Sequence, residues 1–346
     1  MSRFRLVTLV CLVCLVLSFA VLPVPRMAAQ QPEALKVGYL PVVIYAPLFV
    51  GVDRGYFAAE GLNVELIPLP AGGGDSIIQL AAGNFDLAIT GAGAPLWNAA
   101  KQGLAFKIVA PLHTERPPLS TPLVISAKRT EEIKTVADLK GKKVAVNNTG
   151  SAIEYWVYAA ITKAGLSMDD ITLVAMPFPQ MPPALEAGAI DAAVITDPLA
   201  TLAKDQGLVA FLADDFIDGI TVTYVFAGTA LLEQRPAAAE GFMRAYLKAM
   251  RDLQGEAWLD DSIATIIEKY SKVPAAVVKR MNRPYFDPNL TIPTADLEEV
   301  QRYFLSRKVL EYTDPLDVTA FIDATWAQKA VAALGPAPTP EATPGK

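Results

Sequence analysis

The chain alternates short apolar strands with amphipathic helices in three successive strings, LKVGYL (35–40), GYFAAEGL (55–62) and IIQLAAGNFDLAITGAG (77–93). A related alternation returns later, in VADLKGKKVAVNNTGSAIEYWV (136–157) and ALEAGAIDAAVITDP (184–198). In both passes the strands end in Gly, Ser, Thr, Asn or Asp. Two α/β lobes with polar, glycine-bearing strand ends predict a ligand cleft between the lobes.

Apolar periods of two and of 3.6 residues alternate through both halves, which favours a parallel sheet covered by helices on both faces. In the first lobe we expect strands at 35–40, 62–67, 86–90 and 106–110, and helices at 46–59, 75–82 and 95–102. In the second lobe we expect strands at 123–126, 143–146, 171–174, 192–195 and 209–212, and helices at 136–139, 151–164, 181–187 and 198–206. The predicted fold class is therefore α/β.

The chain is expected to pass twice between the lobes. The proline cluster ERPPLSTP (115–122) interrupts the alternation, and TVTYVFA (221–227) has the β-branched and aromatic residues of a returning strand. Two crossings form a hinge about which lobes can close. The predicted division is a first lobe at 30–122, a second lobe at 123–221 and a mostly helical return to the first lobe at 222–334.

The two ends differ from this body. Residues 1–29 combine Arg3 and Arg5 with an apolar run and small residues, which is the pattern of an export signal peptide. Retention of this segment as an anchor, or its lipidation, are the alternatives. Both cysteines lie in it, so the remaining body can form neither a disulfide nor a cysteine metal site. The tail GPAPTPEATPGK (335–346) has almost no apolar bulk and is expected to be disordered.

Size and charge narrow the class of protein. The 346 residues are 52% hydrophobic, which is ample for two cores. The formal charge is −6, and without Arg3, Arg5 and Arg26 the 27 remaining basic residues face 36 acidic ones, a balance of −9. A body this acidic is not expected to bind nucleic acid.

Four strings occur together in the order and spacing of a known family: GYFAAEGL, LAAGNFDLAITGAG, VADLKGKKVAV followed by NNTGS, and ALEAGAIDAAVITDP. They resemble the solute-binding proteins of ABC importers for nitrate, sulfonates, taurine and thiamine precursors. The resemblance implies a two-lobed type II periplasmic-binding-protein fold with two hinge crossings. It also implies a protein in the periplasm or at the outer face of the cell membrane that delivers a small molecule to an ABC permease with its ATPase. We expect a monomer without a cofactor or a metal.

Ligands of open parallel sheets bind beyond the carboxyl ends of the strands, so the loops after the predicted strands are the candidate site. NNTGS places Asn148, Thr149 and Ser151 before a helix, where free backbone N–H groups favour an acceptor or an anion. The same residues suit an ordinary N-cap, and both uses can coexist. Gly91, in GAGAP (91–95), is a further candidate contact, although the glycines of this string also suit a simple turn.

Aromatic side chains gather at strand ends, first helical turns and the predicted hinge: Tyr39, Tyr45, Trp97, Tyr155 and Tyr224. Packing can explain any one of them, but together they predict a flat, partly apolar ligand held by stacking. Trp156 is assigned to the core, because it shares a helical stripe with other apolar residues. Asp197, at a strand end of the second lobe, would either accept from an amino or ring N–H group of the ligand or cap the following helix.

The predicted ligand is a heterocyclic nutrient such as riboflavin or a thiamine pyrimidine precursor, with aliphatic sulfonates, taurine or nitrate as the alternative. No Arg or Lys falls in the candidate loops, which weakens the case for a strongly anionic ligand. His113, the lone histidine, is expected at the surface or the hinge. A pyrimidine-synthesising enzyme of thiamine biosynthesis is similar to this family of binding proteins. It carries a cysteine-rich motif that this body lacks, so no enzyme activity is predicted. A sensory or scaffold role without transport stays open.

Overall fold

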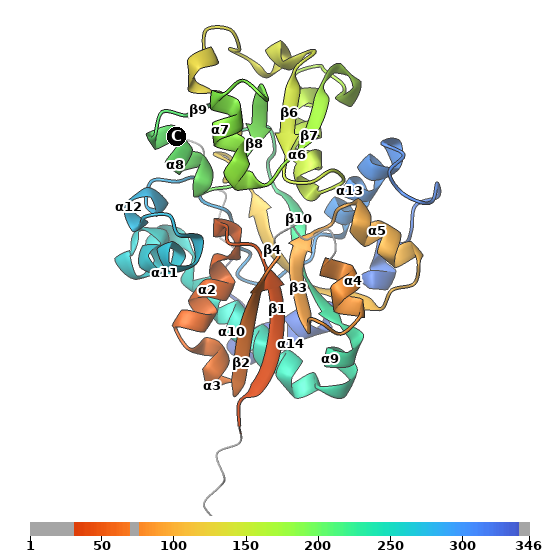
Figure 1. The fold of residues 1–346 in the computed structure, drawn as a ribbon. Coiled ribbons are helices and arrows are strands. Elements are labelled where there is room, and N and C mark those ends of the chain that lie inside the picture. The colour runs from red at the N-terminus through yellow and green to blue at the C-terminus, as the bar shows by residue number, and fades with distance from the viewer. Residues whose placement is uncertain (1–30, 70–75, 339–346) are drawn as a thin grey trace, which may run out of the picture. The chain divides into compact units, whose positions relative to one another are not determined.

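The computed structural model describes residues 31–69 and 76–338. The predicted signal peptide (1–29) and most of the predicted disordered tail (335–346) lie outside these residues. From Glu33 onward the chain forms one compact unit, which is built on two five-stranded sheets, one in each lobe (Figure 1). The predicted two-lobed α/β fold is confirmed.

The first sheet has the strand order β2-β1-β3-β10-β4. Its strands are β1 (Glu33–Tyr39), β2 (Leu62–Pro68), β3 (Leu87–Gly91), β4 (Phe106–Glu115) and β10 (Ile220–Gly228). Strand β1 pairs in parallel with β2 and β3, whereas β10 runs antiparallel to both β3 and β4.

The second sheet repeats this arrangement with the order β7-β6-β8-β5-β9. Its strands are β5 (Leu123–Ser126), β6 (Lys143–Val146), β7 (Thr172–Ala175), β8 (Ala192–Val194) and β9 (Val209–Ala213). Strand β6 is parallel to β7 and β8, and β5 is antiparallel to β8 and β9. The expectation of wholly parallel sheets is therefore wrong for one strand in each lobe. Strands β5 and β10 are the ones that enter from the other lobe, which reverses their direction.

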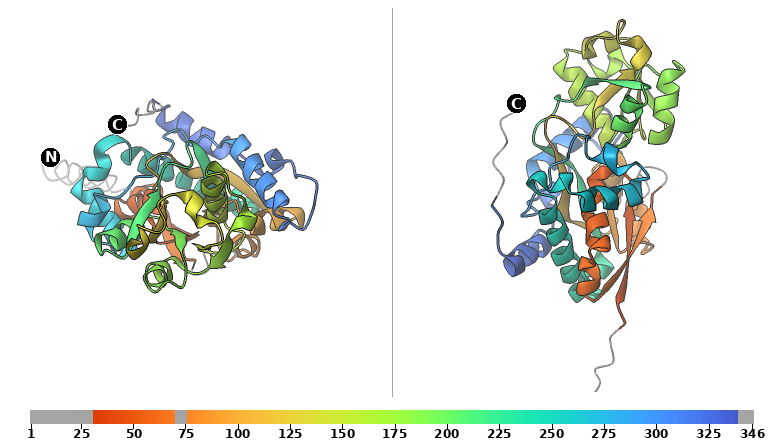
Figure 2. Two further views of the ribbon diagram at one scale, coloured as in Figure 1. Left: turned by 90° about the horizontal axis from the view of Figure 1, so that it is seen from above. Right: turned by 90° about the vertical axis from the view of Figure 1, so that its left-hand side faces the viewer.

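The chain passes between the sheets twice, from β4 to β5 and from β9 to β10, as predicted. The second lobe lies beyond the strand ends of the first in the side view (Figure 2). Its helices are α6 (Ala152–Lys163), α7 (Met181–Glu186) and α8 (Leu199–Asp205).

The other helices belong to the first part of the chain or to its return. They are α2 (Ala46–Asp53), α3 (Tyr56–Ala59), α4 (Ser76–Ala81), α5 (Ala94–Lys101), α9 (Thr229–Gln234), α10 (Pro236–Asp252), α11 (Asp261–Ser271), α12 (Ala275–Val278), α13 (Thr294–Ser306) and α14 (Thr325–Leu334). Helix α10 packs on α2 and α14, and α13 contacts both β10 and α6 of the other lobe.

Strand β3 shows why these strands are apolar along their whole length. Leu87 and Ile89 face the core that contains α2 and α10, whereas Ala88 faces the core that contains α4 and α5. Successive side chains of a strand point to opposite faces of the sheet, so helices on both faces require apolar residues at every position.

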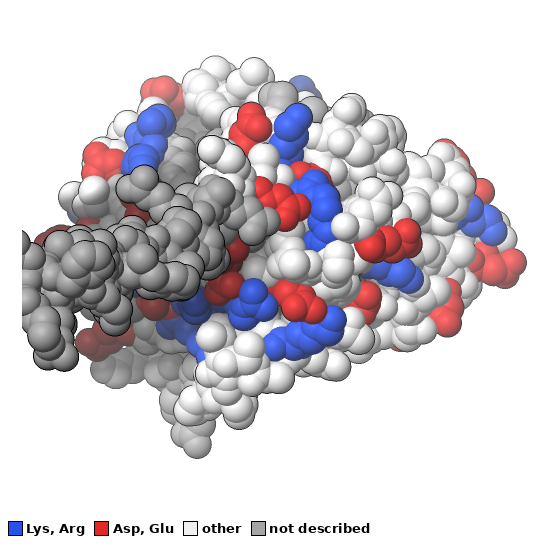
Figure 3. All heavy atoms as spheres, turned by 90° about the horizontal axis from the view of Figure 1, so that it is seen from below, with Lys and Arg blue, Asp and Glu red and all other residues white. Residues whose placement is uncertain are grey.

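The surface of the first lobe seen from below carries both signs of charge (Figure 3). Ion pairs of this lobe include Arg235–Glu33, Arg244–Glu60 and Lys329–Glu240. Of the helices in the described ranges, none has the length and apolar content needed to cross a membrane.

Candidate ligand-binding site

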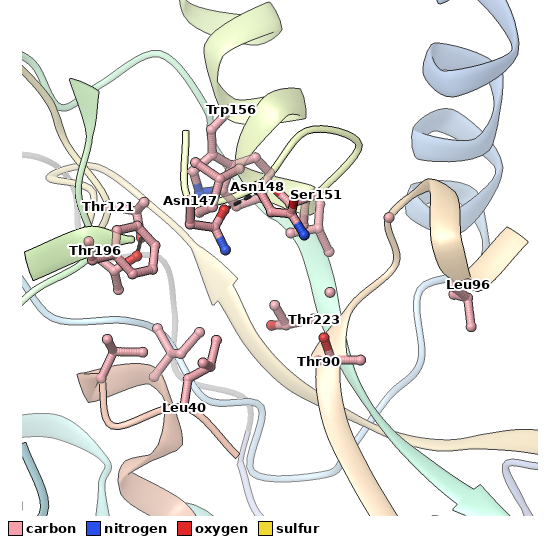
Figure 4. A pocket seen from close by; sticks show the side chains of 18 of the residues that line it. Leu40, Thr90, Leu96, Thr121, Asn147, Asn148, Ser151, Trp156, Thr196 and Thr223 are labelled. Atoms are coloured by element: carbon pink, nitrogen blue, oxygen red, sulfur yellow. Dashed lines mark hydrogen bonds between the residues drawn. The ribbon is translucent and has the colours of Figure 1, made fainter. Parts of the chain in front are cut away.

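A cavity of about 60 Å³ lies between the lobes, at the carboxyl ends of the strands. Asn147, Asn148 and Ser151 line it from the second lobe, opposite Thr90 and Thr223 of the first (Figure 4). Thr121 and Thr196 line it from the side (Figure 4). Hydroxyl and amide groups therefore provide most of its polar surface, together with the imidazole of His113.

The loop after β6 brings four of its five residues 147–151 to the cavity. Asn147, Asn148, Thr149 and Ser151 line it, and Gly150 does not. Ser151 occupies the N-cap position of α6, but its hydroxyl donates to Oδ1 of Asn147 at 2.8 Å instead of capping the helix. Gly150 N donates to Oε2 of Glu154 at 2.7 Å. The side chain of Ser151 is thus held at the cavity and away from the helix end.

The two lobes touch through the loop after β3. Ala94 N donates to the carbonyl oxygen of Gly150 at 2.7 Å, which joins the start of α5 to the start of α6. A Cβ at Gly91 would lie 2.5 Å from Cβ of Ala152, and a Cβ at Gly93 would lie 2.4 Å from the oxygen of Gly150. Both glycines are therefore required for this close approach of the two lobes.

Five of the ten predicted site residues line the cavity: Tyr45, Gly91, Asn148, Thr149 and Ser151. Tyr45 is buried, its hydroxyl donates to the oxygen of Ile89 at 2.8 Å, and burial raises its pKa. Trp156, which the sequence assigned to the core, is buried and also lines the cavity. Of the five aromatic residues predicted at the ligand, only Tyr45 lines the cavity, and Trp156 lines it although it was not among them.

The four other predicted aromatic residues are buried elsewhere. Tyr39 packs edge-on against Phe49, and Trp97 donates to the oxygen of Ala92 at 3.1 Å. The hydroxyl of Tyr155 donates to Glu299, and that of Tyr224 donates to the oxygen of Thr221 at 2.8 Å. These contacts hold their lobes and helices together.

Asp197 also lies away from the cavity and is fully buried. Its Oδ1 accepts from Thr201 N at 2.9 Å, as the helix-cap alternative expected, and its Oδ2 accepts from Asn282 N at 3.1 Å. Burial, assisted by the charge of Glu115, raises the pKa of Asp197 to about 7. Its carboxylate therefore connects the second lobe to the returning segment of the first.

His113 is a cavity residue that the sequence analysis did not select. It lies on β4 at the hinge, as one of the two sequence expectations had it, and it is buried rather than at the surface. The predicted strand ended at residue 110, before Pro111, whereas β4 continues to Glu115. A predicted strand that continued through Pro111 would have placed His113 near the carboxyl ends of the strands.

A second, larger hollow of about 380 Å³ adjoins the cavity, since Leu40, Val42, Asn147 and Phe178 line both. Apolar side chains and prolines dominate its walls. The first cavity, of about 60 Å³, is called the inner cavity. Among the described residues that line it there is no Lys, Arg, Asp or Glu. Over the same described ranges, no cluster of three or more His, Cys, Asp and Glu could hold a metal ion.

Two sheets of this topology, connected by two crossings with a cavity between them, define the two-lobed periplasmic-binding-protein fold. The chain belongs to the NMT1-like family, whose profile matches residues 28–268.

Known proteins of this kind resemble the chain over most of its length. The riboflavin-binding protein RibY of Chloroflexus aurantiacus is 25% identical over 73% of this chain and 75% of its own. A putative aliphatic sulfonates-binding protein of Escherichia coli is 29% identical over 72% of this chain and 76% of its own. The structure of the alkanesulfonate-binding protein SsuA of Xanthomonas axonopodis pv. citri, bound to MOPS, superposes with a TM-score of 0.69 at 22% identity, covering 85% of this chain and 99% of SsuA. The predicted class, a solute-binding protein of the ABC-importer type, is confirmed by the family match and these relatives.

Proposed function

We propose that the chain is an exported, monomeric binding protein that captures an organic solute with a small oxygen-bearing end and a flat, apolar body, and delivers it to an ABC permease with its ATPase. The observation that carries the proposal is a cavity in which hydroxyl and amide groups interrupt mostly apolar walls, with no Lys, Arg, Asp or Glu among its described lining residues, next to a larger apolar hollow. A heterocycle such as riboflavin is the first candidate ligand.

The volumes support different places for the two ends of such a ligand. A cavity of about 150 Å³ holds one benzene molecule, and a single water needs about 10–15 Å³. The inner cavity of about 60 Å³ therefore accepts a group of a few atoms, while the hollow of about 380 Å³ has room for a ring system. Phe178, which lines both spaces, is positioned to contact the body of the ligand.

The charge of the site favours an uncharged heterocycle over a cationic one. Asp197, the carboxylate expected to hold an amino group, has both oxygens occupied by backbone N–H groups. This arrangement disfavours a thiamine pyrimidine precursor and is compatible with riboflavin. The relative RibY, a riboflavin-binding protein, supports the same candidate.

Aliphatic sulfonates are the second candidate. The start of α6 and the hydroxyl groups around the inner cavity suit an oxyanion, and the apolar hollow suits an alkyl chain. The sulfonate-binding relative supports this alternative. Taurine and nitrate have no apolar body and leave the hollow unused.

Thermal shift with riboflavin, thiamine, its pyrimidine precursor, butane-1-sulfonate, taurine and nitrate tests the proposal, because a ligand that binds only the folded state raises the melting temperature. A shift with riboflavin supports the first candidate, and a shift with butane-1-sulfonate alone supports the second. A shift with nitrate or taurine alone contradicts the role given to the apolar hollow. No shift with any probe contradicts the proposed function.

Phe178→Ala sharpens this test. Loss of the ring is expected to weaken binding of riboflavin about 10-fold by calorimetry. Phe321→Ala is the matched control, because Phe321 is also half-buried but packs against Phe106, away from both hollows. Equal losses in the two variants would contradict a direct contact at Phe178.

A further inference from the structure

The only histidine of the chain is built into the wall of the cavity. His113 is 3% exposed, and its Nδ1 lies 2.6 Å from Oγ1 of Thr223 on β10. Its Nε2 is buried and has no hydrogen-bond partner among the described residues, with Oε1 of Glu115 at 3.5 Å. Buried polar groups in native proteins nearly always have a partner, so an unpartnered nitrogen on a side chain that lines the cavity is a candidate contact for a ligand atom.

Glu115 determines that this nitrogen carries a hydrogen. The carboxylate is fully buried, and it accepts from Ser120 N at 2.9 Å and from Ser120 Oγ at 2.8 Å. Burial alone would raise the pKa of Glu115, but the neighbouring imidazole of His113 and the hydrogen bonds from Thr121 and Ser120 lower it below its ordinary value. An ionised carboxylate only accepts hydrogen bonds, so the facing Nε2 is a donor. At 3.5 Å it is too distant for a good bond to Glu115.

His113 is also distinct among the side chains at the cavity. Of the described lining residues, it alone can carry a full positive charge. The other lining group that titrates, the hydroxyl of Tyr45, already donates to Ile89. A ligand oxygen that enters the cavity therefore finds its strongest available side-chain donor at His113.

We propose that His113 is a ligand-binding residue whose Nε2–H donates a hydrogen bond to an oxygen acceptor at the buried end of the ligand. The inference rests on the proposed function, since it requires a ligand in this cavity. A ring carbonyl of riboflavin and a sulfonate oxygen share this chemistry. Because His113 and Thr223 lie on the two hinge strands, the same bond links ligand capture to the hinge.

Nuclear magnetic resonance of the single imidazole tests the contact directly. The protein is labelled with ¹⁵N-histidine and purified without a histidine tag, so that His113 gives the only imidazole signals. Riboflavin and butane-1-sulfonate are added separately, to distinguish a neutral from an anionic acceptor. The Nε2 signal is expected to shift, and its proton to exchange more slowly with water, while Nδ1 changes less.

The outcome separates this inference from the function on which it rests. If a probe raises the melting temperature but leaves the Nε2 signal unchanged, the contact is refuted and the proposed function stands. If no probe of the panel raises the melting temperature, both fail.

Variants provide an independent measurement. His113→Phe keeps a ring but removes the donor, and is expected to weaken binding about 10- to 100-fold. His113→Gln restores an N–H donor and should recover much of the affinity. Thr114→Val is the control, because Thr114 bonds to Thr221 across the same two strands at 2.6 Å without lining the cavity. Equal losses in His113→Phe and Thr114→Val, or no loss in His113→Phe, would overturn the direct contact.

Discussion

The loops after β6 and after β8 are neighbours in the second sheet, and the sequence predicted that both face the ligand. In the structure their polar side chains have different partners. The loop after β6 presents Asn147, Asn148 and Ser151 to the cavity. The loop after β8 presents Thr196 to the cavity but turns Asp197 toward Asn282 in the first lobe. The carbonyl oxygen of Asp197 also accepts from Val43 N at 3.1 Å. The side chains of the loop after β6 therefore line the cavity, whereas the carboxylate of Asp197, in the loop after β8, bonds to the first lobe.

The difference shows what a strand end determines. Position at the carboxyl end brings a residue close to the cleft, but tertiary partners decide the direction of its side chain. Asp197 is oriented by Asn282, which lies 85 positions later in the chain. The two loops should therefore respond differently to pH and to substitution.

The largest expected effect is a loss of stability with rising pH, caused by Asp197. Its pKa is about 7 in the folded state and about 3.9 in an unfolded chain, so between these values the folded state binds more protons. Stability from this group is therefore greatest at low pH and falls as pH rises toward 7. From pH 5 to pH 8 the free energy of unfolding should decrease by about 2–3 kcal/mol.

Urea unfolding at pH 5, 6, 7 and 8 measures this slope. Asp197→Asn should remove most of it, whereas Asn147→Ala, in the loop after β6, should keep the wild-type slope. Glu115 does not interfere, because its lowered pKa confines its loss of stabilisation to pH values below its unfolded pKa of about 4.3. An unchanged slope in Asp197→Asn would remove the contrast between the loops.

A smaller effect is expected where the loop after β6 meets the first lobe. Gly93→Ala would place a Cβ 2.4 Å from the oxygen of Gly150, so the lobes could not close to the present distance. Overpacking of this kind costs about 1–3 kcal/mol, or about 5- to 150-fold in affinity, with little loss of stability because the open form avoids the clash. Calorimetry gives the affinity, and small-angle scattering with saturating ligand gives the dimensions.

Gly228→Ala is the matched control for that substitution. Gly228 precedes α9 with an ordinary φ of −68°, and a Cβ there would have its nearest neighbour at 3.6 Å. It should bind and close as the wild type does. Wild-type affinity in Gly93→Ala would show that ligand binding does not need this contact between the lobes.

The fold could be predicted from the local periodicity of the sequence, but the site could be predicted only in part. The strand predicted at 143–146 coincides with β6, because a short apolar run between polar turns is a local signal. The direction of β5 and β10 depends on the crossings, which periodicity does not report. Pro111 interrupted the predicted strand that leads to His113, although a proline is tolerated within β4.

Tyr155 and Trp156 show the same limit within one helix. The sequence placed Tyr155 at the ligand and Trp156 in the core. Trp156 does belong to the core but lines the cavity as well, whereas Tyr155 packs against Tyr303 at a centroid distance of 5.5 Å. Helix α6 has buried residues on several sides, including Ala152, Tyr155, Trp156, Val157 and Ala160. Its apolar pattern therefore cannot tell which side meets the other lobe.

The smallest expected effect tests the binding role of the loop after β6. Asn147 is half-buried, and its Oδ1 holds the hydroxyl of Ser151 at the cavity. Asn147→Ala should weaken ligand binding by about 1 kcal/mol, roughly 5-fold, with little change in the melting temperature. Asn98→Ala should do the reverse, since Asn98 bonds to Val309 and Glu311 outside the inner cavity. A melting temperature lowered by Asn147→Ala as much as by Asn98→Ala, with affinity retained, would make the loop after β6 as structural as the loop after β8.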